Sequence, residues 1–236
     1  MKLIVLTSCR SRGRHKEILA PGPSFWHLLV CSVSEAKILY KGTTSKHRLM
    51  QPVKLIVIGG SWGGIQASLS ILKDLPAGFP VPVLLVLHRL KNYESDLDGI
   101  YARRLSLQVR EVEEKEEIKP GFVYIAPPNY HVLIERDFTF SLDVSEYENF
   151  SRPSIDVSFT SAANVFGKAA TGILLSGASK DGSRGLKRIA DKGGIALVQD
   201  PAEAEVATMP QSAISLIENC KVLTVTKIQE YLLALL

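Results

Sequence analysis

The chain of 236 residues has a formal net charge of +4, with 46% hydrophobic and 22% charged residues, which suits a globular protein with one large domain. No apolar run reaches the ~20 residues of a membrane-spanning helix, so membrane insertion is not expected. The charge is uneven, because residues 1–49 hold nine Lys/Arg and two Asp/Glu, whereas the rest is slightly acidic. Without a basic stripe interleaved with aromatic residues, the main domain is not expected to bind nucleic acid.

The segment Ser11–Leu49 shows no sustained helical or strand periodicity, and Pro21-Gly22-Pro23 interrupts any helix near its middle. A buried strand of the kind that opens an α/β domain begins shortly after Met50. We therefore expect a basic extension over residues 1–49, disordered or mis-assigned as coding, and one folded domain over residues 50–236. A short targeting or docking tail is the alternative for the extension.

The main domain alternates buried strands with amphipathic helices. Strands are predicted at Val53–Ile58, Val83–Leu87, Gln108–Val112, Phe122–Ala126, Ala170–Leu175, Ile195–Gln199 and Val222–Val225. Helices are predicted at Ile65–Leu75, Ser95–Leu105, Ile155–Val165 (capped by Ser154), Ser183–Lys192, Pro210–Glu218 and Lys227–Leu236. A β-hairpin is predicted around Arg136-Asp137. This order predicts a doubly wound α/β fold, with a mostly parallel sheet, helices on both faces and one β-hairpin.

Cysteine usage points to a reducing compartment. Of Cys9, Cys31 and Cys220, only Cys220 lies in the main domain, which therefore cannot close a disulfide on its own. Cys220 precedes an apolar pair and is expected to be a small core residue. No Cys/His spacing is typical of zinc, so we expect no metal site.

The glycine-rich turn Gly59–Gly64 follows the first strand and has two common explanations. A nucleotide site holds phosphate on N–H groups at a helix N-terminus. However, the G-x-G-x-x-G pattern is not met, the turn has no lysine, and His88 rather than an acidic residue ends the second strand. The other explanation is a nucleophile turn, in which Ser61 lies beside N–H groups that stabilise a tetrahedral oxyanion.

A serine nucleophile needs a base, and the base needs an orienting carboxylate. His88 and Asp181 follow two other predicted strands and supply these groups. Singly, each residue has a simpler explanation: Ser61 and Asp181 could cap helices, and His88 could be a loop histidine. Together they indicate one site, because ligands bind at the carboxyl ends of parallel strands. His131 competes as base, but it enters the hairpin away from this edge and is expected to be structural.

Several ordered segments over roughly residues 53–218 resemble chemotaxis protein-glutamate methylesterases of the CheB type. They are Ile58–Gly64 (the family's IGASTGG), Leu87-His88 (QH), Ile125–His131 (IAPxxxH), Arg152–Phe159 (RPSVDxLF), Leu174–Gly185 (LTGMGxDGAxG), and Gln199-Asp200-Pro201 with Met209-Pro210 (Q…MP). The chain departs from this pattern at Leu87, Trp62, Ala178 and Ser179, where the family has Gln, Thr, Met and Gly.

The resemblance implies a cytoplasmic enzyme that hydrolyses glutamate γ-methyl esters on chemoreceptor helices, releases methanol, deamidates certain receptor glutamines and uses no cofactor. It also implies a triad of Ser61, His88 and Asp181, with the backbone at Trp62 and Ala178 serving the oxyanion. Two alternatives stay open: a triad hydrolase of another ester or amide, and a non-catalytic receptor-binding module. Because residues 1–49 are too short for the receiver domain of many members, we expect a free-standing catalytic domain that is not regulated by phosphorylation in cis.

Overall fold

The computed structural model describes residues 54–88 and 96–236, which lie in one compact unit spanning His47–Leu236. The extension predicted over residues 1–49 lies outside the described residues, as do the first residues of the predicted elements Val53–Ile58 and Ser95–Leu105. Among the residues that the structure describes, no helix is both long enough and apolar enough to cross a bilayer.

The centre of the unit is a seven-stranded sheet with the order β3-β4-β2-β1-β7-β8-β9, and every strand pair in it is parallel. Its strands are β1 (Leu55–Gly60), β2 (Val83–Leu87), β3 (Gln108–Glu111), β4 (Phe122–Ile125), β7 (Ala170–Leu174), β8 (Ile195–Gln199) and β9 (Lys221–Leu223). A separate antiparallel hairpin consists of β5 (His131–Ile134) and β6 (Phe140–Asp143). The chain extends the sheet from β1 in both directions, so a topological switch point, where such folds bind ligands, lies at the end of β1.

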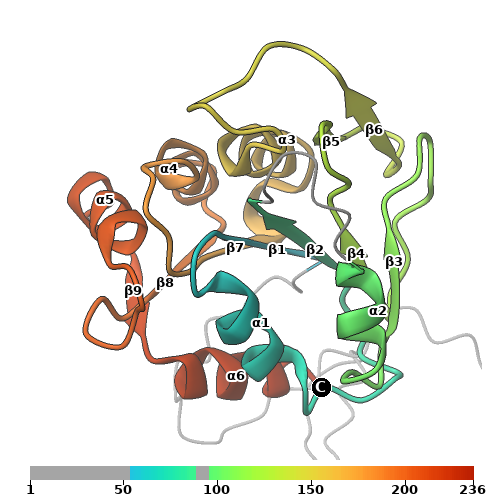
Figure 1. The fold of residues 1–236 in the computed structure, drawn as a ribbon, viewed down its shortest axis with the longest axis horizontal. Helices are drawn as coiled ribbons and strands as arrows, with labels where there is room; N and C mark the ends of the chain where they lie inside the picture. The colour runs from blue at the N-terminus through green and yellow to red at the C-terminus, as the bar shows by residue number, and fades with distance from the viewer. Residues whose placement is uncertain (1–53, 89–95) are drawn as a thin grey trace, which may run out of the picture. The chain divides into compact units, whose positions relative to one another are not determined.

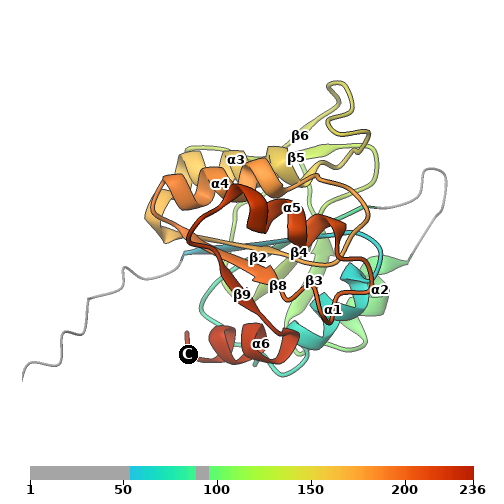
Figure 2. The same ribbon diagram turned by 90° about the vertical axis from the view of Figure 1, so that its left-hand side faces the viewer.

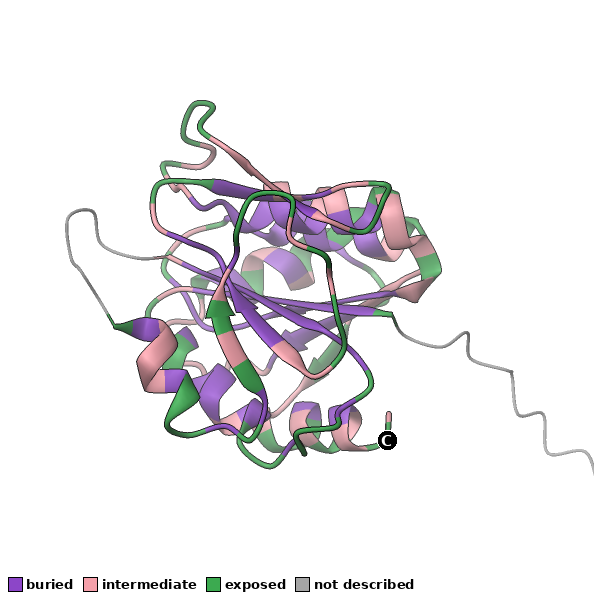
Figure 3. Cartoon of the chain, turned by 90° about the vertical axis from the view of Figure 1, so that its right-hand side faces the viewer, coloured by how far each residue is buried: buried purple, intermediate pink, exposed green. Residues whose placement is uncertain are grey.

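Helices cover both faces of the sheet (Figures 1 and 2). One face carries α3 (Ile155–Phe166), α4 (Ser183–Asp191) and α5 (Thr208–Leu216); the other carries α1 (Gly64–Leu72), α2 (Leu97–Ala102) and α6 (Val225–Leu233); a short 3-10 turn, η1 (Gly167–Ala169), follows α3. Because β1, β2 and β7 are buried on both faces, they separate two hydrophobic cores, and Figure 3 shows the buried sheet between the helical layers.

The predicted doubly wound α/β fold is confirmed, and the differences lie at the ends of elements. β1 runs to Gly60, so the turn after it begins at Ser61 rather than at Gly59. α1 ends at Leu72 rather than at Leu75, since Pro76 restricts the residue before it. The hydroxyl of Ser154 forms no capping bond with α3, although Ser154 is the N-cap residue.

The packing of α3 on β1 gives a first prediction. A Cβ added at Gly59 would lie 2.3 Å from the Cγ2 atom of Ile155, the first residue of α3. We expect Gly59→Ala to lower the free energy of unfolding by about 1–3 kcal/mol, because overpacking forces the helix away from the strand. Urea denaturation measures the loss. Gly78→Ala is the control, since its added Cβ meets nothing within 4 Å, and equal losses in the two variants contradict the prediction.

Candidate active site

The turn between β1 and α1 fixes Ser61 at the carboxyl edge of the sheet. The amide of Ser61 donates to the carbonyl of Ser176, just after β7, at 2.9 Å, and its carbonyl accepts from the amide of Gly64 at 2.8 Å. Gly177 packs so closely that a Cβ there would lie 2.9 Å from the Cβ atom of Ser61. The side chain of Ser61 is half-buried. Its position therefore depends on two loops that are far apart in the sequence.

His88 and Asp181 meet at the same edge. The amide of His88 donates to the carbonyl of Gly60 at 3.1 Å, which holds the histidine beside the turn that carries Ser61. The Nε2 atom of His88 lies 2.9 Å from the Oδ2 atom of Asp181. The carboxylate is fully buried, whereas the histidine side chain is 14% exposed. A buried carboxylate on a partly exposed imidazole is suited to orienting a general base.

The N-terminus of α3 provides most of the cradle around Asp181. Its Oδ2 atom also accepts from the amide of Ile155 at 2.7 Å. Its Oδ1 atom accepts from the hydroxyl of Ser154 at 2.8 Å, from the side-chain amide of Asn149 at 3.0 Å and from the amide of Asp156 at 3.1 Å. A carboxylate at the first turn of a helix is stabilised by free N–H groups and by the helix dipole. Asp181 therefore caps α3 from a distant part of the chain.

These contacts set the charge of two neighbouring carboxyls. Burial is the largest influence on Asp181 and raises its pKa, but the bonds from His88, Ile155 and Ser154 and the charge of His88 outweigh it, so the pKa is lowered overall. The pKa of Asp156 is raised, first by burial and also by the charge of Asp181. Asp181 is thus ionised at neutral pH, as an orienting carboxylate must be.

The lowered pKa predicts an acid-dependent loss of stability. Because the pKa of Asp181 lies below its ordinary 3.8 in the folded chain, its stabilisation is complete above 3.8 and is lost as pH falls through the folded-state value. The difference in unfolding free energy between wild type and Asp181→Asn is expected to be largest near pH 7 and to narrow below about pH 4. Urea denaturation between pH 7 and pH 3 measures it, and a difference independent of pH contradicts the prediction.

The geometry of His88 identifies its Nδ1 atom as the one that can act as the base. With Nε2–H donating to Asp181, the lone pair of a neutral ring lies on Nδ1. The hydroxyl that lies within hydrogen-bond distance of Nδ1 is that of Ser151, at 3.4 Å. Within the described residues, the hydroxyl of Ser61 makes no hydrogen bond to this ring or to any other group. The structure brings His88 and Asp181 together and places Ser61 at the adjoining turn. A hydrogen bond between a nucleophile and its base is often formed only when substrate is bound.

Ser61 is nevertheless a better candidate nucleophile than Ser151. Ser61 is followed by the exposed residue Trp62, and the neighbouring loop presents the exposed residue Ala178. Neither amide donates a hydrogen bond to another described residue, so both can receive an oxyanion. By contrast, the first amides of α3, which follow Ser151, donate to Asp181. The turn at Ser61 thus combines a hydroxyl with two amides that have no hydrogen-bond partner among the described residues.

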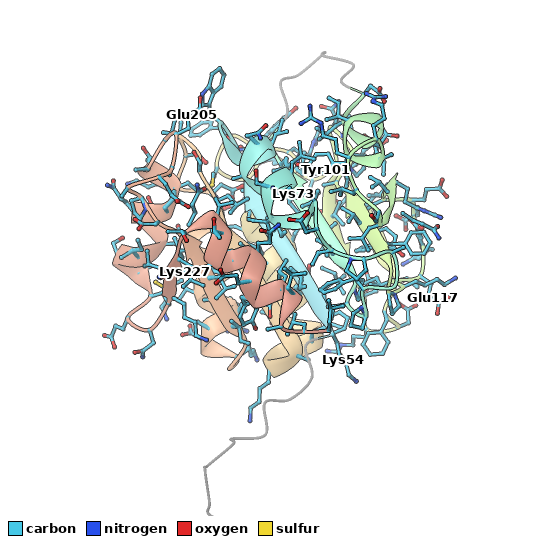
Figure 4. All side chains as sticks on the ribbon, turned by 90° about the horizontal axis from the view of Figure 1, so that it is seen from below. Lys54, Lys73, Tyr101, Glu117, Glu205 and Lys227 are labelled. Atoms are coloured by element: carbon cyan, nitrogen blue, oxygen red, sulfur yellow. The ribbon has the colours of Figure 1, made fainter. Side chains whose placement is uncertain are left out.

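Trp62 borders the site and is held on one side. Its indole Nε1 donates to a carboxylate oxygen of Glu205 at 2.5 Å, although the side chain is 66% exposed. Its carbonyl accepts from the hydroxyl of Ser176 at 2.7 Å. Figure 4 shows Glu205 and Lys54, the residue before β1, at opposite ends of the unit, so the Trp62–Glu205 contact marks the end at which β1 finishes.

His131 is structural in its contacts. It is buried, its Nδ1 accepts from the amide of Ser154 at 3.1 Å, and its Nε2 lies 2.9 Å from the carbonyl of Glu146. Both ring nitrogens are therefore occupied by backbone groups, which leaves no atom for the role of base.

Cys220 is partly buried against the core on the α3 side of the sheet, and burial raises the pKa of its thiol.

Four residues at this edge were not predicted from the sequence as members of the site: Asn149, Ser151, Ser154 and Glu205. Ser154 lies inside the segment Arg152–Phe159, where only its capping position was recognised. Asn149, Ser151 and Glu205 lie in irregular loops without periodicity, where the sequence does not determine side-chain direction. No local pattern in the sequence therefore indicates the contacts that these three residues make.

A serine at a strand-to-helix turn, a histidine at the next strand end and a buried carboxylate on that histidine are the arrangement of an α/β serine hydrolase. The family model described as CheB methylesterase matches residues 56–232. A Leptospira interrogans protein, provisionally named protein-glutamate methylesterase/protein-glutamine glutaminase, is 48% identical over 76% of this chain and 93% of its own length. The chain belongs to the CheB methylesterase family.

Two further comparisons agree. A Thermotoga maritima protein named protein-glutamate methylesterase/protein-glutamine glutaminase is 32% identical over 86% of this chain and 61% of its own length. The crystal structure of the Thermotoga maritima CheB methylesterase catalytic domain matches with a TM-score of 0.73 and 33% identity, covering 79% of this chain and all of that one. The relatives thus share the α/β unit described above.

Proposed function

We propose that this chain hydrolyses glutamate γ-methyl esters on the cytoplasmic helices of chemoreceptors and deamidates receptor glutamines. The observation that carries the proposal is the hydrogen bond between His88 and the buried Asp181, at the edge where the turn of Ser61 lies. The relatives' names, protein-glutamate methylesterase and protein-glutamine glutaminase, supply the substrate class. The two alternatives, another substrate and a non-catalytic module, are not favoured by these names.

In the proposed reaction, the Oγ atom of Ser61 attacks the ester carbonyl while Nδ1 of His88 accepts its proton. The amides of Trp62 and Ala178 hold the tetrahedral oxyanion. His88 then protonates the departing methoxide, and methanol leaves an acyl-serine. A water molecule, deprotonated by His88, releases the glutamate and restores Ser61. Deamidation follows the same steps with ammonia as the leaving group.

The Asp181 carboxylate is the counter-charge for the His88 imidazolium in the proposed reaction. Asp181 is ionised throughout and stabilises the imidazolium that forms in both steps. The hydrogen bonds that the carboxylate accepts from α3 and from Asn149 hold it in place when the ring of His88 moves. We further propose that residues 50–236 act as the catalytic domain in the cytoplasm, where the receptor helices lie.

Two measurements test the proposal. Incubation with chemoreceptor membranes that carry radiolabelled methyl esters is expected to release labelled methanol, and a fluorophosphonate probe is expected to label Ser61, as located by peptide mapping. Labelling without methanol release indicates a hydrolase of another substrate. Absence of both indicates a non-catalytic module, and a label on Ser151 overturns the assignment of the nucleophile.

A further inference from the structure

The loop before α3 contains a tight turn with an unfavourable residue at its tip. Glu148 and Ser151 exchange two backbone hydrogen bonds, of 3.0 Å and 3.3 Å. The two residues between them, Asn149 and Phe150, have φ of 50° and 61°. Two central residues with positive φ are typical of a type I′ turn, which favours Asn followed by Gly. Phenylalanine in this left-handed conformation is strained, because its Cβ approaches the following carbonyl.

The side chain of Phe150 does not compensate for this strain in the free protein. It is 99% exposed, and it has no ring partner among the residues that the structure describes. A fully exposed aromatic ring at a position that suits glycine has no evident structural role. Backbone strain that the fold itself does not require is concentrated at functional sites.

The residues on both sides of Phe150 are hydrogen-bonded to the candidate active site. The side-chain amide of Asn149 donates to Asp181 and to Asp156, each at 3.0 Å. The hydroxyl of Ser151 lies 3.4 Å from the Nδ1 atom of His88. Glu148 forms an ion pair with Arg184 of α4. Phe150 is thus bonded on one side to the residue that contacts Asp181 and on the other to the residue that contacts His88, with its Cα atom ~3.8 Å from each neighbouring Cα.

We propose that Phe150 is a specificity-determining residue that contacts the substrate helix beside the ester. This inference rests on the proposed function, since it takes the occupant of the site to be a receptor helix. A glutamate ester that reaches Ser61 brings the side chains three and four residues along its helix to the same surface, ~5–6 Å away. The ring packs on apolar side chains at these positions. Trp62, another exposed aromatic residue at this edge, extends the apolar surface next to the nucleophile.

The test compares two substrates: methyl-labelled chemoreceptor membranes, and p-nitrophenyl acetate, which is too small to reach beyond the nucleophile. Phe150→Gly is expected to lower the ratio of kcat/KM for the receptor to kcat/KM for the small ester by about tenfold, as loss of an aromatic contact does. The same variant is expected to raise Tm by roughly 2–4 °C, because glycine relieves the strain. A residue with a purely structural role does not give this combination.

Two further variants complete the experiment. Phe150→Leu keeps an apolar side chain and is expected to retain the ratio within about threefold. Phe138→Gly is the matched control, since Phe138 also has positive φ, of 63°, but packs on Phe166 at the far end of α3, and its ratio is expected to stay at the wild-type value. If the wild type hydrolyses the receptor and Phe150→Gly keeps its ratio, or loses rate equally on both substrates, the inference is wrong. If the wild type releases no methanol, the proposed function fails, and the inference fails with it.

Discussion

Replacing Ser61 by alanine is expected to lower the rate of ester hydrolysis by at least about 10³-fold and to leave the fold intact. The rate falls because the proposed acyl intermediate forms on the hydroxyl of Ser61. Stability is retained because the contacts of Ser61 with Ser176 and Gly64 are made by its backbone, and the hydroxyl has no partner among the described residues. Methanol release and thermal unfolding measure the two effects.

Ser151→Ala is the decisive control for this prediction, because the hydroxyl of Ser151 contacts the Nδ1 atom of His88. Its loss of rate is expected to stay within about tenfold, since hydrogen bonds of this length and exposure contribute little. If Ser151→Ala is the inactive variant and Ser61→Ala keeps its rate, the nucleophile has been assigned to the wrong turn.

Replacing Asp181 by asparagine is expected to lower the rate by about 10³–10⁴-fold, because the imidazolium of His88 loses its counter-charge and its correct tautomer. It is also expected to lower the free energy of unfolding by about 2–4 kcal/mol at neutral pH. Five donors converge on the two carboxylate oxygens. In asparagine, an NH2 group replaces one of these oxygens, so a hydrogen-bond donor faces the donors that the carboxylate oxygen accepted from.

Asp191→Asn is the matched control, since Asp191 is exposed and its one ion pair with another described residue is that with Lys187, in its own helix. Exposed pairs of this kind contribute ~0.3–0.5 kcal/mol. Urea denaturation and initial rates distinguish the two variants. If Asp181→Asn is as stable as the wild type, the hydrogen bonds to the carboxylate do not stabilise the fold as expected. If the variant is fully active, the carboxylate does not have the proposed role in catalysis.

The fold could be predicted from the sequence, and three catalytic residues could be proposed from it, for one physical reason. Buried parallel strands are recognisable as apolar runs, and their carboxyl ends share an edge, so Ser61, His88 and Asp181 could be placed together without coordinates. The resemblance to the family then indicated the reaction. Neither argument depends on how individual side chains are oriented.

The contacts of loop residues could not be predicted from the sequence, because they depend on the direction of each side chain. Ser154 was expected to cap α3, but its hydroxyl bonds Asp181, which itself caps the helix from across the fold. Asn149 and Glu205 have no local pattern that indicates a partner, because each contacts a residue far away in the sequence. Such contacts are decided by tertiary packing rather than by propensity.

The central place of β1 has a consequence for when the enzyme can act during its own synthesis. In the sheet, Ile58 of β1 pairs with Ile173 of β7, and His88 has no carboxylate until the chain has been extended past Asp181. Pairings so distant in the chain form slowly, after the local ones. With Ser61, His88 and Asp181 as the proposed triad, a nascent or truncated chain that ends before Asp181 is expected to be catalytically silent. Activity is expected only when nearly the whole domain has been translated and assembled.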